Sequence, residues 1–200
     1  MSLNEEDMER MKQWGFNIVR LGIIWEAVET APGVYNHTYL SEVEELVNRL
    51  SEKGIYSIID THQDLFSRML CGEGVPLFYN PSWEELDHEC PSFQLVGAIF
   101  KLFHQCDSFS TYNIPLDADG LPDIKECAKR DFIALFTSPE VASAWGYFWE
   151  NTNGIQDKFA NYWRVVAAKF MDNTNVLGYD LLNEPWNGNM YQDSSLAYNT

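Results

Sequence analysis

Three short groups of polar residues carry the side chains that could do chemistry in this chain. The last group, Asn183-Glu184-Pro185-Trp186, directly follows an apolar stretch. Burial beside aromatic residues favours the protonated carboxyl group that a general acid needs, which makes Glu184 a candidate for that role. Asn183 offers both a hydrogen-bond donor and an acceptor, which suits a sugar hydroxyl. The residue types also allow a Glu184 that simply faces solvent.

The second group, Asp60-Thr61-His62-Gln63-Asp64, also follows an apolar stretch. If extended backbone continues through it, alternation places Asp60, His62 and Asp64 on one side. His62 could then orient a carboxylate or donate a hydrogen bond to a substrate. The alternative is a histidine that neighbouring backbone satisfies.

Arg20 lies within an otherwise apolar run that ends in the remaining polar group, Trp25-Glu26. A guanidinium in such a run must be paired, and a carboxylate at the same end of a sheet is the expected partner. A purely structural ion pair is the alternative. Among seven tryptophans, Trp25, Trp149 and Trp186 stand beside polar strand or helix ends and could contact a sugar, while we expect most other aromatic residues in the core.

The elements that must position these residues alternate between strands and helices. Apolar spacing predicts helices over about 4–14, 38–53, 138–149 and 155–170, and runs rich in β-branched residues predict strands buried on both faces over 17–25, 55–61 and 175–182. Ser138-Pro139 is a typical helix start. Residues 62 to about 137 lack regular periodicity, and a connection this long is usually functional.

Repeated β-then-α units predict a parallel sheet covered by helices, either open or closed into a barrel. No glycine-rich nucleotide motif follows a strand. Polar groups at the carboxyl ends of several strands favour the barrel. A complete barrel has eight such units and typically about 250 residues, whereas three strands are recognisable here. We therefore expect an α/β fold that is part of a TIM (β/α)8 barrel, about strands two to four, as one domain over 1–200 with a cysteine-containing insertion at about 65–137.

Charge and cysteine content narrow the partners and the compartment. A net charge of −17 argues against nucleic acid, and no stretch approaches the roughly 20 apolar residues of a membrane span. Four cysteines allow three pairings, and of these we favour Cys71–Cys90 with Cys106–Cys127, which would close two successive loops. The Asn36-His37-Thr38 sequon and the clustered cysteines favour a secreted or lysosomal protein, although no signal peptide precedes Met1.

Taken together, these segments resemble glycoside hydrolase family five, and within it the endoglycoceramidases. The resembling stretches are NIVRLGIIWEAVETAPGVYN, YSIIDTHQDLFSR with CGEGVP, GYFWENTNG and VLGYDLLNEPW. Asn-Glu-Pro recurs in several glycosidase families. The combination of Asp-Thr-His-Gln-Asp after one strand and Leu-Leu-Asn-Glu-Pro-Trp after the next is more selective.

The resemblance implies retaining hydrolysis of the link between glycan and ceramide in a glycosphingolipid, without a metal or organic cofactor. It assigns roles to five positions and one catalytic residue: Glu184 is the acid/base, Asn183 contacts the sugar 2-hydroxyl, Arg20 orients the nucleophile, His62 and Asp64 line the site of the sugar next to ceramide, and Trp149 forms a wall of the glycan groove. In the family a nucleophilic glutamate ends the seventh strand, and this sequence stops before it. We therefore expect this chain alone to be inactive.

Three alternatives remain at this point. A β-glucosidase of the same family that removes single glucose from glucosylceramide or steryl glucoside would use the same Glu184. A non-catalytic product could retain only sugar binding. A purely structural βα domain would leave the polar strand ends unexplained. The oligomeric state is not determined by the sequence.

Overall fold

A computed structural model describes residues 3–90 and 106–198 of the chain. The chain divides into two compact units. Unit 1 comprises Met1–His62 and Phe159–Asn183, and unit 2 comprises Gln63–Lys158 and Glu184–Thr200. Each unit is described by itself. That residues 1–200 form one domain stays a prediction.

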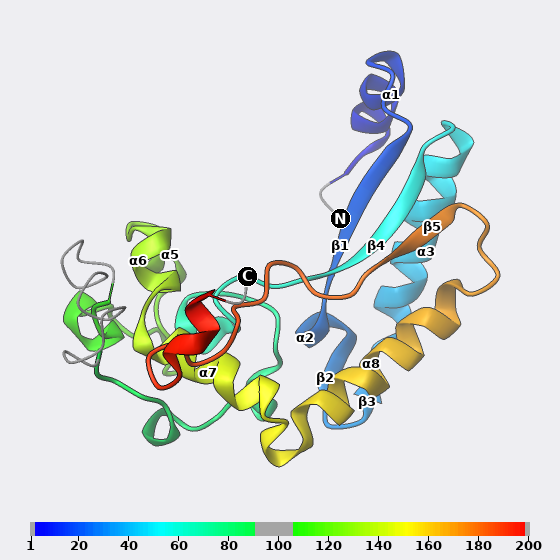
Figure 1. Ribbon diagram of the computed structural model, residues 1–200. Coiled ribbons are helices and arrows are strands. Elements are labelled where there is room, and N and C mark those ends of the chain that lie inside the picture. Colours follow the sequence, from blue (N-terminus) through cyan, green and yellow to red (C-terminus); the bar gives the residue numbers. More distant parts are fainter. Residues whose placement is uncertain (1–2, 91–105, 199–200) are drawn as a thin grey trace. The chain divides into compact units, whose positions relative to one another are not determined.

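Unit 1 is built around a three-stranded parallel sheet in the order β1-β4-β5 (Figure 1). Its elements are α1 (Glu5–Gln13), β1 (Ile18–Ile24), α2 (Trp25–Val28), β2 (Glu29–Ala31), β3 (Val34–Tyr35), α3 (His37–Glu52), β4 (Tyr56–His62), most of α8 (Ile155–Phe170) and β5 (Val176–Asp180). The predicted strands and helices of this unit are therefore present. The short β2–β3 hairpin, which turns at Pro32-Gly33, was not predicted.

Side chains from the helices cover one face of this sheet. Asn4 caps α1 through a capping box, and the Asn36 side chain accepts a hydrogen bond from the Tyr39 N–H at the start of α3. Met8 of α1 and Leu46 and Leu50 of α3 then form a buried cluster. The partly buried side chains of Val19 and Leu21 in β1 pack against that cluster.

The prediction that the strands are buried on both faces is wrong for β1 and β5. Ile18 is 42% exposed and Leu177 is 56% exposed. Burial along β1 instead alternates with a period of two, because the described helices cover the face that carries Val19 and Leu21 and leave the other open. A continuous apolar run shows that both faces tolerate apolar side chains, but not that both are covered.

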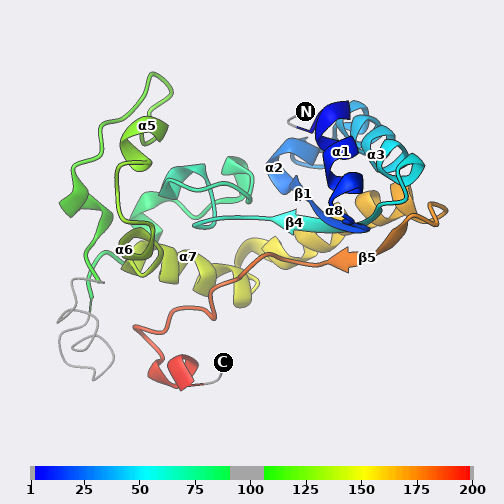
Figure 2. The same cartoon turned by 90° about the horizontal axis from the view of Figure 1, so that it is seen from above.

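Unit 2 consists mainly of irregular chain and short helices, with one longer helix, α7 (Figures 1 and 2). Its elements are η1 (Arg68–Leu70), η2 (Leu77–Tyr79), η3 (Trp83–Glu85), η4 (Phe109–Tyr112), α5 (Ile124–Cys127), α6 (Phe132–Phe136), α7 (Pro139–Trp149), η5 (Thr152–Gly154), the first turn of α8 and η6 (Ser194–Tyr198). Ser138 caps α7 and Pro139 occupies its first turn, as predicted.

Two disulfides cross-link unit 2, and the predicted pairing is wrong. Cys71 is bonded to Cys127, and Cys90 to Cys106. The irregular chain folds back so that the Cα atoms of Cys71 and Cys127 lie 5.6 Å apart across 56 residues. Proximity in sequence is a poor guide in such a segment, because backbone reversals decide which cysteines meet.

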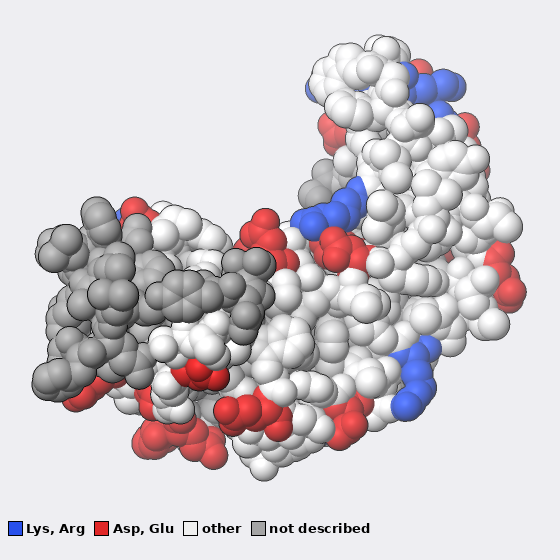
Figure 3. Space-filling model, viewed as in Figure 1, with Lys and Arg blue, Asp and Glu red and all other residues white. Residues whose placement is uncertain are grey.

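Acidic side chains on the surface form separate patches. On the face drawn in Figure 3, the red carboxylates form several separate patches between wide white areas. In the described part of the chain, no helix is both long enough and apolar enough to cross a membrane.

Candidate active site

Arg20 is the centre of a polar cluster on the open face of the unit 1 sheet. Its Nη1 donates to Asp180 Oδ2 (3.1 Å), its Nη2 donates to Asn183 Oδ1 (2.9 Å), and its Nε lies 3.4 Å from Asp60 Oδ2. The strand register explains this convergence. Asp60 and Asp180 are paired neighbours on β4 and β5, and Gly22 of β1 is the register partner of Asp60. Arg20 therefore holds three groups from two other segments, and the expectation that it is paired is met.

Asp60 is the buried member of this cluster. Its side chain is 1% exposed, and its Oδ2 lies 3.0 Å from His62 Nδ1 as well as near Arg20. Its Oδ1 is buried and has no hydrogen-bond partner among the described residues. A buried carboxylate needs charged or hydrogen-bonding partners, so the Arg20 guanidinium and the contact with the His62 ring stabilise it. The predicted same-side placement of Asp60 and His62 agrees with this contact.

Backbone and core contacts fix the strand ends. The Asn183 N–H donates to the Thr61 carbonyl oxygen (3.0 Å), which continues the β4–β5 pairing beyond β5. The Thr61 hydroxyl lies 2.9 Å from the Tyr162 hydroxyl of α8, and both are buried. Burial raises the pKa of Tyr162, so the phenol stays protonated and can donate. Asn183 is itself 4% exposed, which leaves its amide in a fixed orientation toward Arg20.

Glu184 follows Asn183 directly and begins the second segment of unit 2. Its backbone has a φ of 37°, which residues other than glycine adopt rarely, while its side chain is exposed. Within unit 2 the Gln63 amide donates to the Glu184 carbonyl oxygen (3.2 Å), and Gln63 Oε1 accepts from the Phe66 N–H. The buried Gln63 side chain thus supports this backbone conformation. Uncommon conformations that the surroundings enforce cluster at functional sites.

Trp149 is an exposed aromatic residue that is hydrogen-bonded to the chain just after Glu184. Its Nε1 donates to the Trp186 carbonyl oxygen (2.7 Å), two residues after Glu184. Its ring stacks on Trp145, with centroids 6.1 Å apart and planes at 28°. The indole is 44% exposed, so one part of it is available for a ligand. Unit 2 therefore joins Glu184 and Trp149 through one short stretch of backbone.

Asp64 lies in a tight reversal of unit 2. Its backbone exchanges two hydrogen bonds with Glu73 (3.0 and 2.9 Å). Gly72 is required there, because a Cβ atom at this position would lie 1.7 Å from the Asp64 carbonyl oxygen. The segment CGEGVP, which the sequence analysis singled out, thus fixes the backbone of Asp64.

The structure thus places the predicted residues in two groups. Unit 1 brings Arg20, Asn183 and His62 together, and unit 2 holds Glu184, Asp64 and Trp149. Sequence reasoning missed Asp180. It could have been found as the charged residue that ends the apolar strand β5. Sequence reasoning also gave no role to Gln63. The functional roles of all six predicted residues, and the expectation that no cofactor is needed, stay predictions.

Comparison with known proteins gives similar sequences and structures. The model of the family described as cellulase (glycosyl hydrolase family 5) matches residues 2–96 and 131–199. An endoglycoceramidase from Cyanea nozakii is 33% identical over 196 residues, which cover 98% of this chain and 35% of the relative. A glucosylceramidase from Rhizopus delemar is 27% identical, over 92% of this chain and 26% of the relative.

A solved structure of endo-glycoceramidase II from Rhodococcus sp. matches with a TM-score of 0.64 at 28% identity, covering 94% of this chain and 36% of that one. Together with the parallel β1-β4-β5 order, this match confirms the predicted α/β fold as part of a (β/α)8 barrel. The chain spans about a third of the length of the curated endoglycoceramidases it matches.

Proposed function

We propose that this chain, which belongs to the cellulase family of glycosyl hydrolases (family 5), supplies the general acid/base of a retaining β-glycosidase that acts on glycosphingolipids. The bond cleaved is the glycosidic link between glycan and ceramide. The observation that carries the proposal is Glu184, whose exposed carboxylate follows a barrel strand on a backbone with a φ of 37°. Rarely populated backbone conformations that the surroundings enforce cluster at functional sites, which supports this role.

In this mechanism Glu184 first protonates the departing ceramide oxygen. A second carboxylate, about 5 Å away in retaining enzymes, forms the glycosyl-enzyme. Glu184 then removes a proton from the water that hydrolyses this intermediate, so it ends the cycle protonated as it began. The Glu184 side chain is exposed, which differs from the burial beside aromatic residues that the sequence analysis invoked for this role.

Asn183 and Arg20 support the neighbouring sugar contact. The Arg20 guanidinium donates to Asn183 Oδ1, so the amide is held in one orientation. We assign Asn183 to the sugar 2-hydroxyl and Arg20 to positioning, with Asp60 and Asp180 holding the guanidinium. His62 and Asp64 are assigned to the sugar next to ceramide, and Trp149 to stacking on the glycan.

A second candidate is a β-glucosidase that removes single glucose from glucosylceramide or a steryl glucoside. The similarity to a glucosylceramidase favours it. Glu184 would do the same chemistry in both enzymes, so the distinction lies in the product. Intact oligosaccharide released from a complex glycosphingolipid supports the first candidate, and free glucose from glucosylceramide alone supports the second.

The compartment belongs to the same proposal. Two disulfides in unit 2 and the Asn36 sequon support a secreted or lysosomal location. Subcellular fractionation of cells that express the natural protein, with assay of the culture medium, would test this location. Fully reduced cysteines in the purified protein would contradict it.

The test of the function is Glu184→Gln in the longest natural form of the protein, with Glu45→Gln of α3 as an exposed glutamate control. Hydrolysis of unactivated glycolipid should fall by about 10²- to 10⁴-fold in the first variant and stay unchanged in the second. A substrate with an activated aryl leaving group needs no protonation, so it should still form the glycosyl-enzyme in Glu184→Gln. Wild-type turnover of glycolipid by this variant would overturn the assignment.

A further inference from the structure

Unit 2 contains an apolar cavity of about 480 Å³ that the proposed chemistry does not use. Its walls include Met69, Trp83, Phe109, Leu116, Leu121 and Pro122. None of the described residues that line it carries a charge. Its volume lies within the range of small-molecule sites, which are about 300–1,000 Å³ and mostly apolar.

The polar residues of the lining are already committed to local hydrogen bonds. The Ser110 N–H and hydroxyl both contact the Ser108 hydroxyl, and the Asn113 side-chain amide donates to the Thr111 carbonyl oxygen. A sugar would need several donors and acceptors that face the cavity. The lining therefore suits a hydrocarbon rather than a glycan.

The cavity opens to solvent through apolar side chains. Leu116 is 64% exposed and Trp83 is 38% exposed. Large apolar groups gathered around an open cavity cost free energy in water, unless a ligand covers them.

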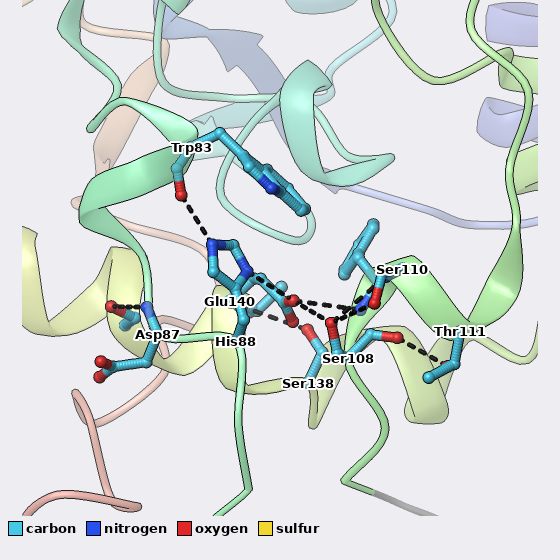
Figure 4. A network of polar contacts seen from close by, with 11 residues as sticks. Trp83, Asp87, His88, Ser108, Ser110, Thr111, Ser138 and Glu140 are labelled. Atoms are coloured by element: carbon cyan, nitrogen blue, oxygen red, sulfur yellow. Dashed lines mark hydrogen bonds and ion pairs between the residues drawn. The ribbon is translucent and has the colours of Figure 1, made fainter.

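A buried polar network holds two aromatic walls of the cavity in place (Figure 4). Glu140 is fully buried, and its Oε1 accepts from the Ser108 hydroxyl (2.6 Å) and the Phe109 N–H (3.2 Å). His88 lies between its own two partners, with Nδ1 3.0 Å from Glu140 Oε1 and Nε2 2.8 Å from the Trp83 carbonyl oxygen. The network thus ties the backbones of Phe109 and Trp83 to one carboxylate.

Ring contacts complete this support. The Trp83 indole lies 4.7 Å from the His88 ring and 6.5 Å from the Phe109 ring, measured between centroids. Burying a carboxylate is costly, so its use here favours one fixed arrangement of the walls. A cavity that is held open before binding loses less free energy on ordering when a ligand enters.

Most of this cavity comes from a part of the chain that the family model does not match. The match leaves out residues 97–130, and Phe109, Leu116, Leu121 and Pro122 all lie in that stretch. The cavity therefore lies mostly outside the residues that the family model matches, although the alignment with the Cyanea nozakii relative covers 98% of the chain.

We infer that this cavity binds an aliphatic chain of an uncharged lipid. The apolar lining calls for hydrocarbon, and the absence of charge among its described residues disfavours a charged end group. A net charge of −17 further disfavours an anionic lipid. The choice of a lipid over another apolar molecule rests on the proposed function, in which the substrate is a glycolipid.

The test uses tryptophan quenching by a long-chain alcohol brominated along its chain, added to the full protein below its micelle concentration. Trp83 is the reporter, because it lines the cavity. Quenching should saturate, and the saturable part should disappear in Trp83→Phe. The matching brominated carboxylate should bind more weakly. Quenching that does not saturate, or that persists in Trp83→Phe, would overturn the inference.

A matched pair of variants locates the site. Leu116 and Ile124 are both 64% exposed and both lie in the stretch 97–130, but only Leu116 lines the cavity. Leu116→Asp should weaken binding of the alcohol by about tenfold or more, because it removes an apolar contact and adds a charge. Ile124→Asp should leave binding unchanged. Equal effects would mean that the alcohol binds the surface in general, which contradicts a defined site.

The binding measurement needs no turnover. If the full protein does not bind the brominated alcohol but still hydrolyses glycolipid, this inference alone is overturned. Retained binding in a protein whose Glu184→Gln variant hydrolyses normally overturns the proposed function alone.

Discussion

The two units place buried carboxylates by different means. In unit 1, Asp60 reaches Arg20 because both lie on regular parallel strands whose register brings them together. In unit 2, Glu140 lies on α7, but its partners His88 and Ser108 come from irregular chain more than 30 residues away in sequence. Regular pairing positions the first group, whereas disulfides and side-chain hydrogen bonds position the second.

This difference predicts where each unit is vulnerable. Strand pairing in unit 1 is distributed over many backbone hydrogen bonds, so no single side chain decides it. Unit 2 has little strand pairing among its described residues, so its irregular segments depend on the two disulfides and on side-chain hydrogen bonds. All four cysteines lie in unit 2, at positions 71, 90, 106 and 127.

The largest effect is expected from removal of the Cys71–Cys127 disulfide by a double substitution to serine. This bond closes a loop of 56 residues and the Cys90–Cys106 bond one of 16. Loop-closure entropy predicts that the free energy of unfolding falls by about 4 kcal/mol without the first bond and by about 3 kcal/mol without the second. Urea unfolding of the two double serine variants, each with its remaining disulfide oxidised, would measure both losses.

Region-resolved hydrogen exchange supplies the control for that comparison. The loss should appear as faster amide exchange in unit 2, with strands β1, β4 and β5 little changed. If amide exchange became faster by the same factor in the strands of unit 1, the disulfide would not stabilise unit 2 alone, and the comparison between the units would be wrong.

Glu140→Gln should have the next largest effect, about 3 kcal/mol, because it weakens the hydrogen bonds that a fully buried carboxylate accepts from Ser108 and Phe109 and shares with His88. The matched control is Glu150→Gln, an exposed residue that ends the same helix. It should change the free energy of unfolding by less than about 0.5 kcal/mol. Thermal unfolding followed by circular dichroism would compare the two. Similar values for both would mean that the network adds no stability.

The sequence allowed most of unit 1 to be predicted for the same physical reason that makes it robust. Helical and strand periodicity follows from local patterns, so β1, β4, β5, α3 and the break before α8 were found close to their observed bounds. Strand ends could be located, and with them His62, Asn183 and Glu184, while Arg20 was found as a charged residue within an apolar strand. The roles of these residues stay predictions.

Unit 2 could not be predicted to the same depth. The pairing of Cys71 with Cys127 depends on backbone reversals such as the left-handed Cys71 itself, with a φ of 64°. Glu140 gave no signal, because an acidic residue in the first turn of a helix is ordinarily explained by the helix dipole. Only the tertiary structure shows that it is fully buried beside His88.

The smallest predicted effect separates two carboxylates that contact the same guanidinium. Asp180 is 37% exposed at its side chain and Asp60 is 1% exposed, although both contact Arg20. Asp180→Asn should cost only about 0.5 kcal/mol, because solvent screens an exposed pair. Asp60→Asn should cost about 2 kcal/mol, because the buried partner loses charge-assisted contacts to Arg20 and His62. Equilibrium urea unfolding of the two isosteric variants measures this difference. Equal losses in the free energy of unfolding would mean that burial does not set the strength of these two ion pairs.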